Sequence, residues 1–404
     1  MSAKSAGGVI RPVKDLSALV APGPGFGQRL RLDPLLLVAV IGLGVCSVIT
    51  IASATVDDIP GQPHYYLYRQ LIYFGVGLLL MFAVSRIDYS RLRELKFGLY
   101  GLMIFSILAV LALGAASRGS RRWIELPLIN FQPSELGKLL LVVALSAFAV
   151  DRARRIGDRD TTARIMLLAL IPAALVMLQP DLGTGLVYLV IALATLFIAG
   201  TPWTHFAALG ALFGIAVALT LVVAPAVGVE VLKPYQVNRL TAFLNPSDNP
   251  ANESYQLNQS RIAIGSGERT GRGDQATQTR LNFLPEHHTD FIFAVVGEQF
   301  GFVGTALVLL LYALLIWRSL RILTLAKNLY GALIAGGLVA MLMFQVFVNI
   351  GMTIGIMPIT GIPLPLMSFG GSSVLVTLLA VGLLQSIHAQ GRDSASGKGF
   401  GSTF

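Results

Sequence analysis

Long apolar stretches, each near 20 residues, are the feature that most constrains how this chain can fold. A helix needs about 20 mostly apolar residues to cross the hydrocarbon core of a bilayer. With 54% hydrophobic and only 13% charged residues, the chain does not have the composition of a soluble domain of 404 residues. The sequence predicts an all-α polytopic membrane protein with about ten transmembrane helices, over residues 34–54, 68–84, 97–116, 133–150, 164–178, 182–199, 205–229, 291–317, 331–357 and 372–388.

The basic residues in the short loops predict the orientation in the membrane. Loops rich in Lys and Arg face the cytoplasm. With ten helices, three such loops lie on one side, and they contain Arg86, Arg91, Arg93 and Lys96, then Arg152, Arg154, Arg155, Arg159 and Arg164, then Arg318, Arg321 and Lys327. We therefore expect this side and both termini to be cytoplasmic, and residues 230–290 to form a long extracellular loop between helices 7 and 8.

The ends of the chain differ in composition from the apolar stretches. Residues 1–30 are rich in Gly, Pro, Ser and basic side chains and lack periodicity, so we expect a disordered cytoplasmic tail. The transmembrane domain is predicted over 31–390, and 391–404 is predicted to be a second cytoplasmic tail. A net charge of +9 is ordinary for a membrane protein with basic cytoplasmic loops, and no nucleic-acid partner is predicted.

A polar run at 284–298 stands where a membrane helix is expected to begin. It contains three carboxylates and two neighbouring histidines: Glu286, His287, His288, Asp290 and Glu298. Charged groups at a membrane edge are costly and therefore indicate function, so this run is the candidate active site. The adjacent histidines lack the i, i+4 spacing of a zinc site on a helix. A site for Mg²⁺ or Mn²⁺, in which carboxylates and a substrate phosphate hold the ion, fits the run better than a zinc site.

Two further groups of charges lie at predicted outer helix ends. Glu135 and Lys138 stand three residues apart on one helix face, where they can pair. They form either a structural ion pair or one wall of a polar cavity that faces Asp290. Asp181 follows a Gln-Pro break, and it is either a helix cap or a functional carboxylate.

The remaining candidates are polar groups on irregular segments. Arg118, Arg121 and Arg122 lie on the outer side against the orientation rule, which indicates either an anionic ligand or lipid headgroups. The Pro- and Gly-rich stretch 357–373 is either a re-entrant turn or a phosphate or sugar site, with hydroxyls at Ser368, Ser372 and Ser373. The glycines at 265, 267, 271 and 273 miss the dinucleotide-binding spacing, so we expect a flexible loop and no organic cofactor.

The motifs together resemble the SEDS family (shape, elongation, division and sporulation), which contains the RodA and FtsW peptidoglycan glycosyltransferases. They are 122–123 (RW), 131–138 (FQPSELGK), 178–184 (LQPDLGT), 254–267 (SYQLNQSRIAIGSG), 283–293 (FLPEHHTDFIF) and 361–373 (GIPLPLMSFGGSS). Two positions depart from the family pattern: Phe369 replaces the usual tyrosine, and Gln299 replaces a usual glutamate. Segments 277–285 and 349–352 look more like RodA, the elongation branch, than like FtsW.

The resemblance implies polymerisation of lipid II into β-1,4 glycan strands outside the membrane, with undecaprenyl pyrophosphate as leaving group. Asp290 matches the essential aspartate of the family and is the expected base. An α-linked donor that gives a β link requires inversion in a single displacement. The leaving pyrophosphate needs positive charge from a divalent cation, from the three outer arginines, or from both. The residues expected to bind substrate or to support the site are Arg118, Arg121, Arg122, Glu135, Lys138, Asp181, Glu286, Ser368, Ser372 and Ser373.

The resemblance also implies partners, and other functions stay open. A class B penicillin-binding protein is expected to supply the crosslinking transpeptidase, within the elongation or division machinery, and membrane lipids surround the helices. One rival function is a lipid II flippase, which needs charges along a path through the midplane of the membrane. A second is a scaffold without catalysis, and a third is a polymerase of the division branch.

Overall fold

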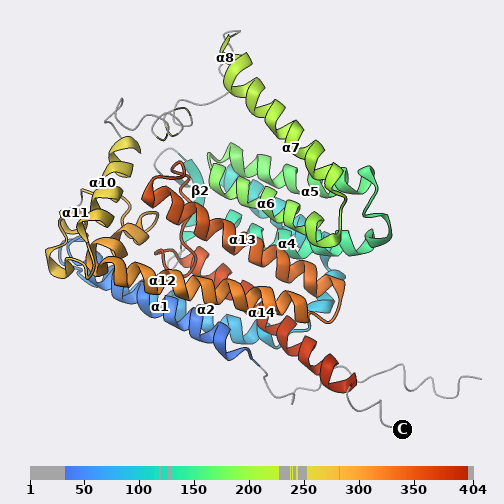
Figure 1. Cartoon of the computed structure of the whole chain (residues 1–404), viewed down its shortest axis with the longest axis horizontal. Helices are drawn as coiled ribbons and strands as arrows, with labels where there is room; N and C mark the ends of the chain where they lie inside the picture. Colours follow the sequence, from blue (N-terminus) through green and yellow to red (C-terminus); the bar gives the residue numbers. More distant parts are fainter. Residues whose placement is uncertain are drawn as a thin grey trace, which may run out of the picture. The chain divides into compact units, whose positions relative to one another are not determined.

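Helices make up most of the computed structural model, which describes residues 32–113, 115–117, 120–125, 130–226, 237, 239, 243, 253–281 and 283–398. Nine helices of this described part are long and apolar enough to cross a membrane, and α3 is a shorter apolar helix. These nine helices and α3 are α1 (Pro34–Ala54), α2 (Tyr65–Ser85), α3 (Lys96–Leu113), α4 (Pro133–Asp151), α5 (Arg159–Leu178), α6 (Leu182–Ala199), α7 (Trp203–Ala218), α12 (Ile292–Leu325), α13 (Leu329–Ile354) and α14 (Gly371–Lys398) (Figure 1). The predicted all-α polytopic fold is confirmed.

Most helix ends have a local cause in the sequence. Asp33 accepts the N–H of Leu36 and precedes Pro34, so it caps α1. Asn328 accepts the N–H of Gly331 in the same way at α13. α6 and α13 each end at a glycine in the left-handed conformation, Gly200 and Gly355. These signals explain why the predicted bounds of α1 and α6 agree with the structure.

The last helix is longer than the sequence predicts. α14 continues to Lys398, whereas a tail was expected from residue 391. Gly391 packs so closely on the end of α12 that an added Cβ would lie 2.2 Å from the Leu325 carbonyl oxygen. This tertiary contact supports the extra helical turns, and periodicity alone does not indicate it. Residues 1–31 and 399–404, where tails are predicted, lie outside the described residues.

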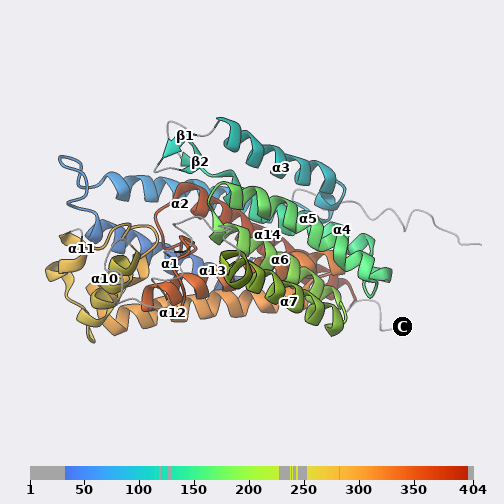
Figure 2. The ribbon, with the colours of Figure 1, turned by 90° about the horizontal axis from the view of Figure 1, so that it is seen from above.

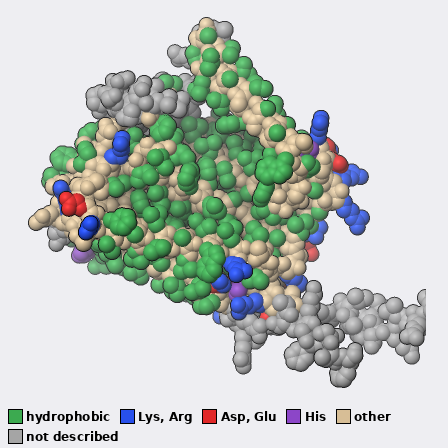
Figure 3. Space-filling view, in the orientation of Figure 1, with side chains coloured by type: hydrophobic (Ala, Val, Ile, Leu, Met, Phe, Trp, Pro, Cys, Tyr) green, Lys and Arg blue, Asp and Glu red, His purple; other side chains and the backbone are tan. Residues whose placement is uncertain are grey.

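The helices pack around a core formed mainly by α4, α13 and α14. α14 lies along α2, α12 lies between α1 and α13, and α4 contacts α3 and α6. In α7, by contrast, no residue is buried. On the face drawn in Figure 3, hydrophobic side chains cover most of the surface, and basic side chains gather near helix ends. This distribution suits a chain surrounded by lipid.

α12 is broken near its start. Gly301 has φ 62° and ψ −156°, so the helix consists of two pieces on either side of it. The backbone N–H groups of Phe302 and Val303 donate to the carbonyls of Glu268 and Arg269 at 2.9 and 3.1 Å. A neighbouring turn therefore satisfies the backbone that the break leaves without intrahelical partners.

That turn belongs to the segment predicted to be a flexible loop. It follows α10 (Glu253–Ser266) and leads to a short 3₁₀ turn (Gly273–Gln275) and to α11 (Thr277–Arg280). A Cβ added to Gly267 would lie 1.8 Å from the Gly297 carbonyl oxygen, and one added to Gly271 would lie 2.1 Å from that of Gln299. The flexible-loop expectation is wrong at these two glycines, because they let two backbones touch. Residues 230–236, 238, 240–242, 244–252 and 282 of the predicted extracellular loop, and residues 227–229 of the predicted seventh helix, lie outside the described residues.

A small antiparallel sheet connects α3 to α4. Its strands are β1 (Ala115–Ser117), β2 (Ser120–Glu125) and β3 (Asn130–Phe131), in the order β1-β2-β3. In Figure 2, β1 and β2 lie beside the end of α3, which agrees with the contact between α3 and β2. The sequence does not indicate this sheet, and the third helix, predicted to run to Ala116, ends at Leu113.

Candidate functional site

The segment that contains Asp290 is held at three successive backbone carbonyls. The N–H of Phe369 donates to the carbonyl of His288 at 2.9 Å. The hydroxyl of Ser368 donates to the carbonyl of Thr289 at 2.5 Å, and the side-chain amide of Asn349 donates to that of Asp290 at 2.9 Å. Since all three donors come from α13 or from the stretch before α14, Asp290 is held by elements distant in sequence.

The carboxylate of Asp290 lies beside the irregular stretch 357–370. Asp290 is half-buried, and its Oδ2 is 3.5 Å from the position that a Cβ at Gly361 would take. Gly361 has φ 73°, which favours glycine. On its other side this stretch packs on α6, because a Cβ at Gly183 would lie 3.0 Å from the carbonyl oxygen of Thr360. The stretch thus lies between the base candidate and the start of α6.

The other two carboxylates of the polar run have structural hydrogen bonds. The hydroxyl of Thr289 donates to Glu286 Oε2 at 3.0 Å, and Glu286 has φ 55° in the same turn. Glu298 is fully buried. It accepts the N–H groups of Gln278 and Thr279 at 2.8 and 3.1 Å and the Thr279 hydroxyl at 2.6 Å. Glu298 therefore holds α11 onto α12.

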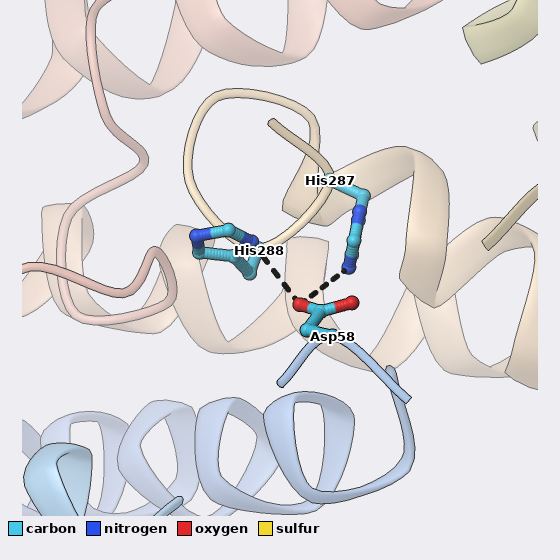
Figure 4. Close-up of side chains that lie close together, drawn as sticks. All are labelled: Asp58, His287 and His288. Atoms are coloured by element: carbon cyan, nitrogen blue, oxygen red, sulfur yellow. Dashed lines mark ion pairs between the residues drawn. The ribbon is translucent and has the colours of Figure 1, made fainter. Parts of the chain in front are cut away.

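The two histidines meet an aspartate that sequence reasoning missed. Asp58 lies in the turn after α1, and its Oδ2 is 3.2 Å from His287 Nε2 and 3.7 Å from His288 Nδ1 (Figure 4). The three side chains form a group whose ligand atoms all lie within 4.8 Å of one another. No spacing in the sequence connects Asp58 with residues 230 positions later, so only the fold identifies this group.

Glu135 and Lys138 form a buried ion pair at the start of α4. Lys138 Nζ is 2.6 Å from Glu135 Oε1, and both side chains are almost inaccessible. The phenol of Tyr188 donates to the carbonyl of Ser134 at 3.0 Å. Pairing is what makes two charges tolerable in such a position. That the pair faces Asp290 stays a prediction.

A third polar group joins α4, α6 and α14. The side-chain amide of Gln132 donates to Asp181 Oδ2 at 3.2 Å, while Asp181 Oδ1 caps α6 by accepting the N–H of Thr184 at 3.1 Å. The backbone N–H of Gln132 donates to the Ser372 hydroxyl at 2.9 Å, and that hydroxyl donates to the Asn130 carbonyl at 3.0 Å. Asp181 and Ser372 thus both bind the segment before α4, and Asp181 is a helix cap.

The remaining predicted residues are placed only in part. Arg122 donates to the carbonyls of Gln179 and Pro180, to the former at 2.8 Å, so it holds the turn between α5 and α6. Ser373 is buried in the first turn of α14. Arg118 and the side chain of Arg121 lie outside the described residues. The structure accordingly brings Asp290, Glu286 and Ser368 together, and separately Asp181, Arg122 and Ser372.

Comparison with known proteins identifies relatives over nearly the whole chain. The FtsW/RodA/SpoVE family of cell cycle proteins matches residues 31–393. The chain is 38% identical over 364 residues to the peptidoglycan glycosyltransferase MrdB of Escherichia coli K12, covering 90% of this chain and 95% of that protein.

Solved structures show the same fold. A chain from a structure described as "Structural coordination of polymerization and crosslinking by a peptidoglycan synthase complex" is 35% identical and has a TM-score of 0.76, with coverage of 90% of this chain and 99% of that chain. The rod shape determining protein RodA of Thermus thermophilus is 32% identical with a TM-score of 0.64, and the match covers 89% and 97% of the two chains.

Proposed function

The chain belongs to the FtsW/RodA/SpoVE family of cell cycle proteins, and we propose that this peptidoglycan glycosyltransferase uses Asp290 as the base that extends a glycan strand. The main support for this proposal is that the half-buried carboxylate of Asp290 lies on a segment held in a fixed position. Three donors hold the carbonyls of residues 288–290, and the carboxylate lies against Gly361. A general base must be positioned within hydrogen-bond reach of the proton that it removes.

The proposed reaction polymerises lipid II. Asp290 accepts the proton of the acceptor's GlcNAc 4-hydroxyl while that oxygen attacks the anomeric carbon of the donor's MurNAc. The bond from this carbon to undecaprenyl pyrophosphate breaks in the same displacement, so an α-linked donor gives a β-1,4 link. The pyrophosphate leaves with the electron pair of the broken bond.

The negative charge of the leaving group needs compensation. Mg²⁺ or Mn²⁺ bound to carboxylate and phosphate oxygens is the proposed source, because hard cations prefer oxygen ligands. Glu286 is the carboxylate of the run that fits this role, since Asp290 acts as the base and Glu298 is fully buried where it holds α11. Lys138 is paired with Glu135 in a buried site, which suits a supporting role better than direct contact with phosphate.

The proposed location is the cytoplasmic membrane, with the termini inside and Asp290 at the outer surface. The loop between α2 and α3 and the loop between α4 and α5 support this orientation. They contain Arg93 and Lys96, which contact Asp151, and Arg152, which contacts Asp160. These basic loops follow the positive-inside rule, and the Asp290 segment precedes α12 at the opposite helix ends.

A class B penicillin-binding protein is the proposed partner. A polymerase makes strands and has no serine site for crosslinking them, and one similar chain was solved in a complex that coordinates polymerization with crosslinking. The proposed process is cell elongation and shape maintenance. It is supported by the 38% sequence identity to MrdB and by the structural similarity to RodA.

The test is a lipid II polymerisation assay on the full chain, purified with its partner in detergent. Asp290→Asn is expected to abolish strand formation without lowering the thermal unfolding temperature, because the amide keeps the size of the side chain and loses its basicity. The matched control is Asp57→Asn, in an exposed position of the loop after α1, which should leave the activity intact.

Retained polymerisation by Asp290→Asn would exclude it as the base. A flippase would be favoured if the unmodified complex did not polymerise lipid II but did transport it across vesicle membranes. The detergent assay separates the two functions because transport needs two compartments and polymerisation does not.

A further inference from the structure

The group Asp58, His287 and His288 has the geometry of a metal site. It lies between the turn after α1 and the segment before α12, and its side chains are only 11%, 4% and 18% exposed. All three residues point their ligand atoms toward one place (Figure 4). Two imidazoles and one carboxylate are the ligand set that zinc accepts with a fourth position left to water or another ligand.

A backbone hydrogen bond orients the ring of His287. Its Nδ1 is 3.2 Å from the carbonyl oxygen of Leu284. Because a carbonyl oxygen can only accept, Nδ1 is the nitrogen that donates a proton there. In the neutral ring, Nε2 then presents a lone pair to Asp58 Oδ2, 3.2 Å away. Such a backbone contact orients metal-binding histidines.

The distances fit a shared cation better than a pair of hydrogen bonds. His288 Nδ1 is 3.7 Å from Asp58 Oδ2, which is too long for a hydrogen bond. Two ligands of one tetrahedral zinc ion, each about 2.1 Å from the metal, lie about 3.4 Å apart. The observed 3.2 and 3.7 Å lie on either side of this value. Among the described residues, moreover, neither Asp58 Oδ2 nor His287 Nε2 has a hydrogen bond.

The rings are held in place by their neighbours. His288 lies against Tyr66 with ring centroids 4.6 Å apart and meets the edge of Phe369 at 5.9 Å. Tyr66 also contacts Phe369. This aromatic packing leaves His288 little freedom to turn away, so the ligand set is preformed.

We propose that Asp58, His287 and His288 bind a zinc ion that fastens the segment of Asp290 to the turn after α1. Imidazole nitrogens favour zinc over magnesium, so this site differs in chemistry from a cation that accompanies the pyrophosphate. Asp290 lies two residues after His288. The bound ion therefore acts as a positioning element for this segment, and its binding does not depend on the proposed reaction.

The test measures zinc binding by the full chain, purified in detergent with an affinity tag free of histidine and stripped with a chelator. Zinc alone is titrated in competition with a chromophoric chelator, and cobalt is added separately for its visible spectrum. We expect one zinc per chain and the strong absorption of tetrahedral cobalt. Asp58→Asn and His287→Gln should each weaken zinc binding at least about 100-fold, since even residues that only support ligands contribute 10- to 100-fold.

Matched controls come from the same loop. Asp57→Asn and His64→Gln alter exposed residues of the same types and should bind zinc like the unmodified chain. Asp58→Cys should restore binding, because thiolate is also a zinc ligand. Zinc should raise the thermal unfolding temperature of the unmodified chain and of Asp58→Cys but not of Asp58→Asn, which also shows whether each variant is folded.

Absence of stoichiometric zinc in the unmodified chain would overturn the proposal and leave an ion pair between Asp58 and protonated histidines. The proposal would also be overturned if Asp57→Asn weakened zinc binding as much as Asp58→Asn does, since the binding would then be nonspecific. Loss of polymerase activity in Asp290→Asn bears on the base alone, so the two proposals can fail separately.

Discussion

At the scale of single residues, the site is defined by what surrounds Asp290 rather than by Asp290 alone. Ser368 was expected either to bind phosphate or sugar or to belong to a re-entrant turn, and its hydroxyl donates to the Thr289 carbonyl and accepts the N–H of Leu364 at 2.8 Å. It therefore positions the segment of Asp290. Glu298 likewise supports α11. A sequence motif identifies such residues together, whereas the hydrogen bonds distinguish the proposed base from the residues that support its segment.

Gly361 allows a test of how closely the carboxylate of Asp290 is positioned. Gly361→Ala places a methyl group 3.5 Å from Asp290 Oδ2 at a residue with φ 73°. We expect about 1–2 kcal/mol of destabilisation from the left-handed backbone and a loss of polymerase rate of at least about tenfold, because the methyl group takes up space beside the carboxylate that the acceptor hydroxyl has to reach. Rate and thermal unfolding are both measured.

The control for Gly361→Ala is Gly200→Ala. Gly200 has φ 89° and open space where a Cβ would be. It should show a similar loss of stability with full activity. Equal activity in the two variants would mean that space beside Asp290 does not matter.

At the scale of elements, the sequence predicts helices well and their irregularities poorly. In the described part of the chain, apolar length identified the nine long helices and the shorter α3, and the caps at Asp33 and Asp181 fix two starts. The break at Gly301 was not predicted, because glycine within an apolar stretch indicates no kink without the turn 268–272 that satisfies the broken backbone. The same limit applies to Asp58, because it lies far in the sequence from the two histidines that it contacts.

Gly301→Ala tests the break in α12. A Cβ there would lie 2.4 Å from the backbone nitrogen of Gly271, and its φ and ψ of 62° and −156° suit glycine alone. The strain costs about 1–3 kcal/mol, and the backbone clash adds to it. We expect a clearly lower thermal unfolding temperature in detergent.

Gly210→Ala in α7 is the matched control, because a Cβ there meets nothing within 4 Å. Alanine favours a helix over glycine, so this variant should be as stable as the unmodified chain or slightly more stable. If Gly301→Ala were equally stable, α12 would be able to straighten, and the contacts with the turn 268–272 would not be required.

At the scale of the whole molecule, one buried aspartate joins α1, α12 and α14. Asp33 Oδ1 accepts from Leu36 and Arg318 at 3.0 and 3.1 Å. Its backbone exchanges two hydrogen bonds with the Gln385 side chain, at 2.7 and 3.2 Å. Burial raises the pKa of Asp33, but the hydrogen bonds of Arg318 and Leu36 and the charge of Arg318 outweigh this effect and hold the pKa below its usual value.

The lowered pKa has a defined consequence for the dependence of stability on pH. A carboxylate with a depressed folded-state pKa contributes stability above its unfolded pKa of about 3.9. That contribution is lost as the pH falls through the lower, folded-state pKa. The contacts among α1, α12 and α14 are therefore expected to weaken only in acid.

Asp33→Ala should destabilise the whole molecule by about 3–5 kcal/mol, because it leaves Arg318 without its buried partner. The matched control is Asp158→Ala: Asp158 stands at the N-cap of α5, is exposed and makes no capping hydrogen bond with its side chain, so little change is expected. Thermal unfolding in detergent at neutral pH measures both. Similar unfolding temperatures for the two variants would show that the helices α1, α12 and α14 stay together without the Asp33 contacts, through apolar packing alone.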